Sequence, residues 1–365
     1  MTVEAMTVSM PRPLPGASAS IEVRSKTSGG AFEAGPQETL LYAALRAGVA
    51  VPYECATGTC GTCKARRITG VIINDWIDAP GAAYLKPDRD EVLLCQTRAL
   101  SACSFEIPGS ANLAVSRRPQ PGFGQAVLDR IEHLTADVVT LHLRMGAPLD
   151  FTAGQFVVLR APQIGGFRAY SMVNRAVRTS EVEFVIKKKP GGQFTEWLFS
   201  RAAPGDRMEW FGPLGKATFE AQEQRTIVCI AGGSGIASIM SILAVGCDAS
   251  HFSHFDGAVY FGVRTAADMF YLDRLSGFAA AFPDNLRITI VLSHDTPTDE
   301  LRRRHPHLGF ASGFPHEIAA QELAGRFAGR VAYLAGPPIL VDVSIRMLIT
   351  QARLPARDIR YDKFS

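Results

Sequence analysis

Four cysteines of this chain stand at the spacing of metal ligands. Cys55, Cys60 and Cys63 form a C-x4-C-x2-C pattern, and Cys95 follows about 30 residues later. This pattern is typical of a plant-type [2Fe–2S] site, in which four thiolates hold two irons. The sequence therefore predicts an iron–sulfur cluster that gains and loses single electrons.

The chemistry also makes demands on the loop between these cysteines. Three ligands must wrap one edge of a flat cluster within a short segment, so the backbone has to turn tightly. We expect Gly58 and Gly61 to adopt conformations that a Cβ would penalise. We also expect loop amides, including those near Thr62, to donate hydrogen bonds to the sulfurs.

A structural zinc site is the alternative use of four thiolates. Zinc ligands usually come as two C-x2-C pairs, whereas this chain has one C-x2-C, one C-x4-C and the distant Cys95. We therefore favour iron–sulfur. The other cysteines, Cys103, Cys229 and Cys247, have no such spacing and are expected to be small buried hydrophobes.

A second group of residues suits a flavin. Arg168-Ala169-Tyr170-Ser171 precedes Gly191-Gly192-Gln193-Phe194-Thr195 by about 20 residues. A guanidinium suits a pyrophosphate, a tyrosine face suits a flat ring system, and a Gly-Gly turn at a helix N-terminus suits a phosphate. Each element alone is weak evidence, but together and in this order they predict a flavin site. Val185 and Lys187, on the strand before the turn, are further expected cofactor contacts.

A third group suits a nicotinamide dinucleotide. The apolar strand expected at 226–231 leads into Gly232-Gly233-Ser234-Gly235, and the strand expected at 331–335 leads into Gly336-Pro337. Glycine turns at the carboxyl ends of parallel strands are where a dinucleotide binds an open α/β sheet. Asp268 favours a free ribose 2′-hydroxyl, while Arg264 would favour a 2′-phosphate. Because no further basic cluster follows, we expect NADH in preference to NADPH.

These sites require three folded blocks. With 365 residues, 47% of them hydrophobic and 20% charged, the chain is long enough for two or three domains. The patterns predict a multidomain chain: an α+β ferredoxin-type (β-grasp) domain with a helix over 38–49, an antiparallel β-barrel and an α/β parallel sheet. The expected boundaries are a tail at 1–19, the ferredoxin domain at 20–108, a linker at 109–125, the flavin barrel at 126–222 and the nucleotide domain at 223–365.

In these residues the chain resembles the reductase components of bacterial multicomponent oxygenases, which belong to the ferredoxin–NADP reductase superfamily. It looks most similar to reductases of toluene-type diiron monooxygenases, in Pro52-Tyr53-Glu54-Cys55 and Asp78-Ala79-Pro80-Gly81 among other stretches. The resemblance implies FAD, NADH and a [2Fe–2S] cluster in an NADH:acceptor oxidoreductase.

The resemblance assigns roles to the flavin and nucleotide residues. Arg168 would contact the FAD phosphates, Tyr170 would lie against the ring and Ser171 would bond near its N5. The pyrophosphate would lie on the Gly191 turn, and the nicotinamide nucleotide on the turns that begin at Gly232 and Gly336. The chain ends Asp362-Lys363-Phe364-Ser365, and in related enzymes an acidic residue and a terminal aromatic close over the flavin. Asp362 and Phe364 take those places, with a plain hydrophobic anchor as the alternative for Phe364.

Two residues depart from the family pattern. Ala335 stands where cysteine is common, and Ser238 stands where proline is usual. Neither residue type does redox chemistry, so we expect altered nicotinamide positioning and slower transfer, not loss of function.

The acceptor is expected to be another protein. The chain has no Cys-x-His pair for a Rieske centre and no Glu-x-x-His pair for a carboxylate diiron site. Two acceptors are considered: the oxygenase of a diiron hydrocarbon or aromatic monooxygenase, or that of a Rieske dioxygenase or demethylase, each reached directly or through an intermediary ferredoxin. A non-enzymatic redox sensor is the remote alternative. Residues 74–81, with Trp76, are either a docking surface or ordinary packing.

Composition and charge exclude several classes of partner and location. The formal charge of +3 argues against nucleic acid or anionic lipid as a partner. No long uninterrupted apolar run predicts a membrane span, and no secretory signal is recognisable at the N-terminus. We expect a cytoplasmic monomer that serves the catabolism of aromatic hydrocarbons.

Overall fold

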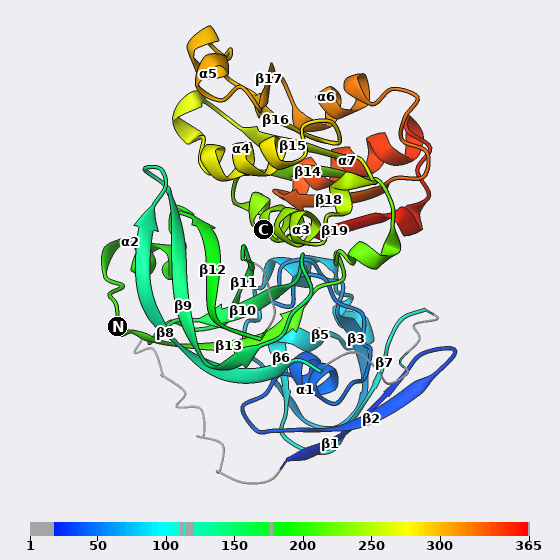
Figure 1. Ribbon diagram of the computed structural model, residues 1–365. Coiled ribbons are helices and arrows are strands. Elements are labelled where there is room, and N and C mark those ends of the chain that lie inside the picture. The colour runs from blue at the N-terminus through cyan, green and yellow to red at the C-terminus, as the bar shows by residue number, and fades with distance from the viewer. Residues whose placement is uncertain (1–17, 110–112, 114–119, 175–177, 364–365) are drawn as a thin grey trace, which may run out of the picture. The chain divides into compact units, whose positions relative to one another are not determined.

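The computed structural model describes residues 18–109, 113, 120–174 and 178–363 (Figure 1). These residues form two compact units. The first unit consists of the described residues up to Tyr53 together with those of Gly61–Gln120. The second unit consists of Glu54–Cys60 together with the described residues from Pro121 onward. The expected barrel and nucleotide domains therefore belong to one compact unit. Most of the expected tail and linker lie outside the described residues.

The first unit is an α+β domain, as expected. Its main sheet has the order β2-β1-β7-β3-β5, and β4 pairs with β6 in a small second sheet. Helix α1 (Leu40–Arg46) presents an almost wholly buried run of side chains to this domain's core. The strands are β1 (Ala19–Arg24), β2 (Gly29–Ala34), β3 (Lys64–Thr69), β4 (Ile72–Asn74), β5 (Glu91–Leu93), β6 (Thr97–Ala99) and β7 (Cys103–Glu106).

Helix α1 is shorter than the helix expected over 38–49. Glu38 lies before it, where its carboxylate accepts two hydrogen bonds from Arg46 at 2.8 and 2.9 Å and one from the Gly35 amide. The helix stops before Gly48, whose φ of 80° is a left-handed conformation that terminates helices. The apolar pattern thus located the helix correctly but extended it at both ends.

The second unit begins with an antiparallel barrel, which confirms the barrel predicted for the flavin block. Its strand order is β11-β10-β13-β8-β9-β12, and a bridge between Met172 and Phe184 joins the two outer strands. Alternate side chains such as Val182, Phe184 and Ile186 fill the interior. The elements are β8 (Gly122–His133), β9 (Val138–Leu149), β10 (Phe156–Arg160), β11 (Arg168–Ser171), β12 (Thr179–Lys187), α2 (Gln193–Ser200) and β13 (Arg207–Leu214).

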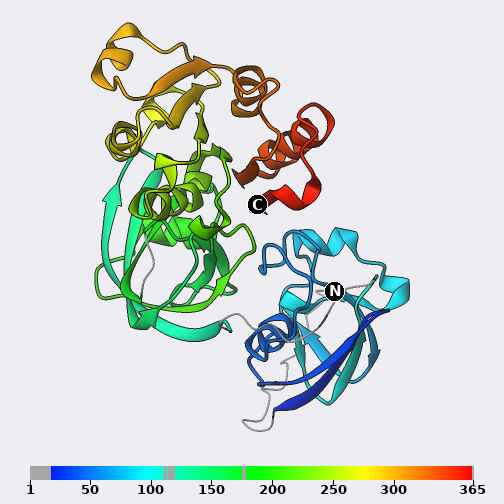
Figure 2. The same ribbon diagram turned by 45° about the vertical axis from the view of Figure 1, so that its right-hand side comes forward.

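A six-stranded parallel sheet follows, in the order β17-β16-β15-β14-β18-β19. Helices α3 and α4 cover one face and α6 and α7 the other (Figures 1 and 2). The strands are β14 (Ile227–Gly232), β15 (Gly257–Val263), β16 (Leu286–Leu292), β17 (Gly309–Ser312), β18 (Val331–Gly336) and β19 (Ile359–Lys363). The helices are α3 (Ile236–Asp248), α4 (Leu272–Ala281), α5 (Asp299–Arg304), α6 (Pro315–Glu322) and α7 (Pro338–Thr350).

The barrel and the parallel sheet share one apolar core. Outward-facing barrel residues, among them Val173 and Val185, join the cluster that holds Phe252 and Phe261 of the sheet domain. Polar contacts border this core: the hydroxyls of Thr140 and Tyr271 lie 2.9 Å apart, and the Ser241 hydroxyl donates to the Asn174 carbonyl at 3.0 Å. This shared core explains why the two predicted domains form one unit.

The two predicted glycine turns meet at the carboxyl ends of β14 and β18. A Cβ on Gly235 would lie 2.5 Å from the Ala335 carbonyl oxygen, and one on Gly336 would lie 3.0 Å from the Gly232 nitrogen. Gly336 also has a φ of 142°, which disfavours any side chain. Backbone meets backbone here, so these glycines are required by packing.

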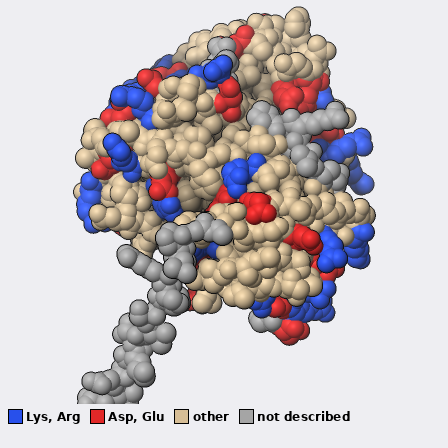
Figure 3. Space-filling view, turned by 90° about the horizontal axis from the view of Figure 1, so that it is seen from below, with Lys and Arg blue, Asp and Glu red and all other residues tan. Residues whose placement is uncertain are grey.

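The surface carries charges of both signs. On the face shown in Figure 3, basic and acidic side chains alternate over short distances, which agrees with the small formal charge of +3. In the described part of the chain, no helix is long and apolar enough to cross a membrane.

The glycine contacts predict opposite effects for two Gly→Ala substitutions. Gly235→Ala should destabilise the second unit by about 1–3 kcal/mol, because the added methyl must displace backbone. Gly277→Ala, at an exposed position in α4 with open space around it, should stabilise by roughly 0.5–1 kcal/mol. Thermal unfolding of both variants measures this; equal midpoints would contradict the packing assigned to Gly235.

Candidate functional site: three cofactor sites on two compact units

The loop that carries the first two cysteines is shaped to hold a thiolate. The backbone amides of Thr57, Thr59 and Cys60 each donate to Cys55 Sγ at 3.4 Å. A side-chain hydrogen bond from Cys60, together with these amides, outweighs burial and lowers the pKa of the Cys55 thiol to about 4. A sulfur that is charged at neutral pH and surrounded by amides suits an iron ligand.

The cysteines lie in two pairs. Cys55 contacts Cys60, and the sulfurs of Cys63 and Cys95 lie 3.3 Å apart. Each pair supplies the two thiolates that one iron of a two-iron cluster takes from a protein, so the donor set fits a [2Fe–2S] group.

The conformations expected of the loop glycines are confirmed. Gly58 has a φ of 92° and Gly61 a φ of 78°. A Cβ on Gly61 would also lie 2.7 Å from the ring of Tyr84. The loop therefore requires glycine for two reasons: its backbone conformation and, at Gly61, the close packing of Tyr84.

The remaining cysteines follow the expectation with one exception. Cys229 and Cys103 are buried, and burial raises the pKa of both thiols. Cys247 is only half-buried, although desolvation still raises the pKa of its thiol to about 11. Of the suggested docking segment, Trp76 is 39% and Ile77 72% exposed, so the docking interpretation stays a prediction.

Strand β11 places the predicted flavin residues in one row. Arg168, Ala169 and Tyr170 are half-buried and Ser171 is buried. Because side chains alternate along a strand, Arg168 and Tyr170 face one side while Ala169 and Ser171 face the other. The ring of Tyr170 lies 5.2 Å from that of Phe194 at an angle of 40°. An arginine and an aromatic on one face fit a flavin nucleotide, whose phosphates and flat ring need such groups.

The glycine turn before α2 is also present. Gly191 is exposed with a φ of 71° and open space around its Cα, and Gly192 is the N-cap of α2. Gln193 is exposed at the first position of the helix, so its amide can face a phosphate.

Thr195 differs from the expected pyrophosphate ligand. It is buried, and its hydroxyl accepts from the Lys189 amide at 3.1 Å while lying 3.0 Å from the Lys189 carbonyl. Thr195 thus closes the turn that presents Gly191, and its direct contact with a phosphate stays a prediction.

Strand β12 links the flavin barrel to the nucleotide turn. It contacts the single-turn 3₁₀ helix at Gly233–Gly235. Val185 is buried in the core shared by barrel and sheet, and the Lys187 ammonium lies 3.1 Å from an Asp137 carboxylate oxygen. Val185 therefore packs at the junction of barrel and sheet and Lys187 is paired within the barrel, and their contact with a cofactor stays a prediction.

The nucleotide turn contains two kinds of glycine. Gly232 and Gly235 are packed against the β18 turn, as described above, whereas Gly233 has a φ of 52° and open space where a side chain would be. Ser234 is half-buried and precedes α3, and Pro337 is exposed at the second turn. Within the first turn, Gly233 is therefore the glycine that leaves open space beside the backbone.

Asp268 caps a short 3₁₀ helix, a role that its position in the sequence did not predict. Its Oδ2 accepts from the amide and the hydroxyl of Thr265, at 2.9 and 2.8 Å, in a capping box. Burial favours the neutral form, but these bonds outweigh it and lower the pKa of Asp268, with smaller contributions from Lys187 and Arg264. Arg264 lies 4.0 Å from the other oxygen and is largely exposed. The carboxylate is therefore charged and held in place after β15, where a dinucleotide ribose binds in folds of this class.

The C-terminal strand brings Asp362 to the barrel. Asp362 is buried at 6% exposure, and its Oδ1 lies 3.6 Å from where a Cβ on Gly215 would stand. The same Gly215 position lies 3.0 Å from the ring of Phe156, the strand partner of Ser171. The sheet and the barrel thus bring Asp362 and Ser171 to the same region, although they are far apart in sequence.

The Asp362 carboxyl is unusual for a buried acid. Its Oδ2 has no hydrogen-bond partner among the described residues. Burial, and second the carboxylate of Glu54, which belongs to the same compact unit, raise the pKa of Asp362 to about 7. An unpaired buried polar atom costs stability unless another group satisfies it, so a hydrogen-bond partner for this oxygen would stabilise the folded protein. The other expected closing residue, Phe364, lies outside the described residues.

The two departures from the family pattern lie close to this region. Ala335 is the direct strand partner of Asp362, so a small side chain stands beside the acid. Ser238 is buried in the first turn of α3, and its hydroxyl donates to the Gly235 carbonyl at 3.3 Å, a bond that proline could not make. Their effect on hydride transfer stays a prediction.

One residue near the nucleotide site was missed by sequence reasoning. Tyr271 has a φ of 60°, which is strained for an aromatic residue, while its hydroxyl contacts Thr140 and its ring lies under Arg274. No local sequence signal distinguishes it from an ordinary core tyrosine.

Comparison with known proteins agrees with the three sites. Residues 23–100 match the family model of the 2Fe-2S iron-sulfur cluster binding domain, 125–219 that of the oxidoreductase FAD-binding domain, and 229–344 that of the oxidoreductase NAD-binding domain. Among solved structures, a ferredoxin reductase of carbazole 1,9a-dioxygenase is similar with a TM-score of 0.80 and 28% identity, over 96% of this chain and 99% of that one.

Full-length relatives are also found. The ferredoxin–NAD(+) reductase component of the alkene monooxygenase system of Xanthobacter autotrophicus is 34% identical over 340 residues, covering 92% of this chain and 98% of the relative. The reductase component of phenol 2-monooxygenase from a Pseudomonas species is 32% identical over 351 residues, covering 94% of each. From this similarity along nearly its whole length, the chain belongs to the reductase components of multicomponent oxygenases, oxidoreductases with FAD, NAD and [2Fe–2S] domains.

Proposed function

We propose that this reductase supplies electrons from NADH to the oxygenase component of a diiron hydrocarbon or aromatic monooxygenase. The observation that carries this proposal is the full-length similarity to reductase components of alkene and phenol monooxygenases. The protein would act in the cytoplasm as a monomer, and the oxygen chemistry would take place on the partner.

A second acceptor has support of its own. A ferredoxin–NAD(P)(+) reductase of Metapseudomonas resinovorans and the reductase subunit of an aromatic O-demethylase are 31% and 32% identical to this chain, and the similar solved structure is a ferredoxin reductase of carbazole 1,9a-dioxygenase. These values lie close to those of the monooxygenase relatives, so a Rieske-type dioxygenase or a demethylase is the alternative partner. Reconstitution of hydroxylation with purified oxygenases of each type tests the choice; turnover only with a dioxygenase or a demethylase would overturn the first proposal.

The barrel residues would hold FAD. Arg168 would bind its phosphates and the Gly191–Gly192 turn its pyrophosphate, while Tyr170 would lie along the ring. When bound, FAD accepts a hydride from NADH and passes the electrons on singly. The buried Ser171 hydroxyl would orient the reacting ring system by a hydrogen bond.

The parallel sheet would hold NADH. The open backbone at Gly233 and Ser234 would face the nucleotide, and Gly336 and Pro337 would border it from β18. Asp268, held charged by Thr265, would accept from a ribose 2′-hydroxyl and repel a 2′-phosphate. This contact supports NADH over NADPH.

Asp362 would serve the flavin as a proton-holding group. A carboxyl with a pKa of about 7 carries a proton below neutral pH and loses it above. The proton on its oxygen can then be donated to a hydrogen-bond acceptor beside Gly215. Such a group, poised near the working pH, suits general acid–base chemistry.

The cysteine loop would carry electrons out. Cys55 and Cys60 would hold one iron, Cys63 and Cys95 the other, and the amides on Cys55 would stabilise negative charge on the sulfur.

Cys60→Ser tests the order of the cofactors. The substitution removes one thiolate, so NADH-dependent cytochrome c reduction should fall to background while flavin bleaching by NADH under anaerobic conditions persists. Cys247→Ser, at a half-buried cysteine outside the loop, is the matched control and should keep both activities. Survival of cytochrome c reduction in Cys60→Ser would show that the cluster assignment is wrong.

Asp362→Asn tests the raised pKa through stability. Since the folded pKa of about 7 exceeds the ordinary aspartate pKa of 3.8, the unfolding free energy of the wild type should fall as pH rises from about 4 to 7, by roughly 4 kcal/mol at most. Above this window the contribution stays lost. The asparagine variant should lack this loss, whereas Asp342→Asn, at an exposed carboxylate, should follow the wild type. Thermal midpoints between about pH 5 and 8 measure it, and parallel curves for wild type and Asp362→Asn would refute the raised pKa.

A further inference from the structure

Strand β19 carries Asp362 at the edge of the parallel sheet, where β18 is its only strand neighbour among the described residues. An edge strand depends on side-chain contacts to hold its free side. Three ion pairs fasten this segment: Asp358 with Arg225 at 2.7 Å, Arg360 with Glu223 at 2.6 Å, and Lys363 with Asp342 at 2.8 Å.

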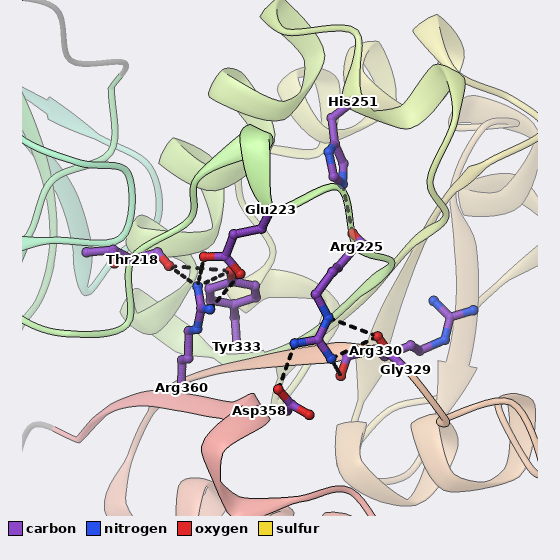
Figure 4. Close-up of polar contacts among 9 residues, drawn as sticks. All are labelled: Thr218, Glu223, Arg225, His251, Gly329, Arg330, Tyr333, Asp358 and Arg360. Carbon is purple, nitrogen blue, oxygen red and sulfur yellow. Dashed lines mark hydrogen bonds and ion pairs between the residues drawn. The ribbon is translucent and has the colours of Figure 1, made fainter.

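Arg360 is the member of these pairs that reaches the segment between barrel and sheet with several hydrogen bonds. Its guanidinium donates to both carboxylate oxygens of Glu223, at 2.7 and 2.6 Å, to the Thr218 carbonyl at 2.6 Å and to the Tyr333 hydroxyl at 3.0 Å (Figure 4). A two-pronged arginine–carboxylate pair fixes direction as well as distance. Glu223 and Thr218 both belong to the segment that joins barrel strand β13 to sheet strand β14.

Arg360 and Asp362 act on the same side of the strand. They are two residues apart, so their side chains leave the same face, whereas Lys363 points to the other face and reaches α7. The connecting segment that Arg360 grips begins at Gly215, against which Asp362 lies. The arginine thus ties the strand to the piece of backbone that buries the acid.

We propose that Arg360 is a positioning residue, which holds β19 against the connecting segment so that the Asp362 carboxyl stays buried beside Gly215. This inference rests on the proposed role of Asp362 at the flavin. Without the guanidinium, the last residues of β19 keep their bonds to β18, the Lys363 pair and the 3.2 Å bond from the Tyr361 hydroxyl to Glu54. None of these contacts holds the strand to the connecting segment, so water reaches the Asp362 carboxyl.

Because of the charges around Asp362, the direction in which its pKa shifts in an Arg360 variant distinguishes lost charge from lost positioning. Glu54 is the charged group that acts on its carboxyl. Its neighbours on β18 and in the barrel, Ala335 and Gly215, are uncharged, and Arg360 shares its face of the strand. Loss of a nearby cation would by charge alone raise the pKa of Asp362, whereas exposure to water would lower it. A downward shift can therefore come only from lost positioning.

Arg360→Met in the FAD- and cluster-loaded protein tests the proposal. We measure the rate of flavin bleaching by NADH between about pH 5 and 9, and deuterium uptake of the peptide that covers 356–363. The wild type should show an inflection near its pKa of about 7. In the variant the inflection should move down by about one unit or more, as expected for a carboxyl that regains water, and the peptide should exchange several-fold faster.

Two further variants complete the design. Lys363→Met removes the ion pair on the opposite face and should leave the inflection at its wild-type pH. Arg360→Lys keeps one bond to Glu223, so its inflection should lie between those of the wild type and Arg360→Met. If Arg360→Met does not fold, Glu223→Gln removes the same pair from the other side and should speed exchange of the same peptide.

The outcomes separate this inference from the proposed function. An unchanged or raised inflection in Arg360→Met, unchanged deuterium uptake, or an equal downward shift in Lys363→Met would overturn the positioning role. A wild-type protein whose flavin NADH does not bleach would overturn the proposed function instead, and the deuterium uptake would then still decide whether Arg360 holds the strand.

Discussion

The apolar core between the barrel and the parallel sheet is the interaction on which the reductase half of this protein depends. Residues such as Val173 and Val185 leave the outer surface of the barrel and pack with Phe261 of the sheet. Hydride transfer requires the reacting atoms of two rings, each bound by a different fold, to lie about 3–3.5 Å apart. Non-directional burial holds the folds together, and the polar contacts at its border, such as Thr140 with Tyr271, set the angle between them.

The glycines of the nucleotide turns serve two different ends. Gly232, Gly235 and Gly336 allow the backbones of β14 and β18 to touch, while Gly233 leaves open space. A glycine-rich turn is usually attributed to the ligand it receives. In this protein two of the three glycines of the first turn are required by packing, and Gly233 is the one that leaves open space.

Ionisable groups near the predicted cofactor sites are held in different protonation states by their surroundings. The buried, unpaired carboxyl of Asp362 is tolerated because a proton can neutralise it, which is the usual response of an acid to desolvation. Around it, the ion pairs of Arg360 and Arg225 fasten the edge strand without burying an unbalanced charge. At the cysteine loop the opposite arrangement holds, since amides on Cys55 favour the anion.

Local patterns alone determined much of this architecture. The cysteine spacing predicted the cluster, and alternating or continuous apolar runs predicted β12, β14 and β18, because periodicity reports which face a residue buries. Short or glycine-containing strands such as β4, β13 and β17 carry too few residues or too weak a pattern to be recognised. Tertiary structure decided the rest: the closing of the barrel at Met172 and Phe184, the joining of barrel and sheet, the capping task of Asp268, and the burial of Asp362 beside Gly215. Each of these features depends on contacts between residues that are distant in sequence, or on the hydrogen-bond partners that a side chain acquires only in the folded protein. Local propensity does not encode such contacts.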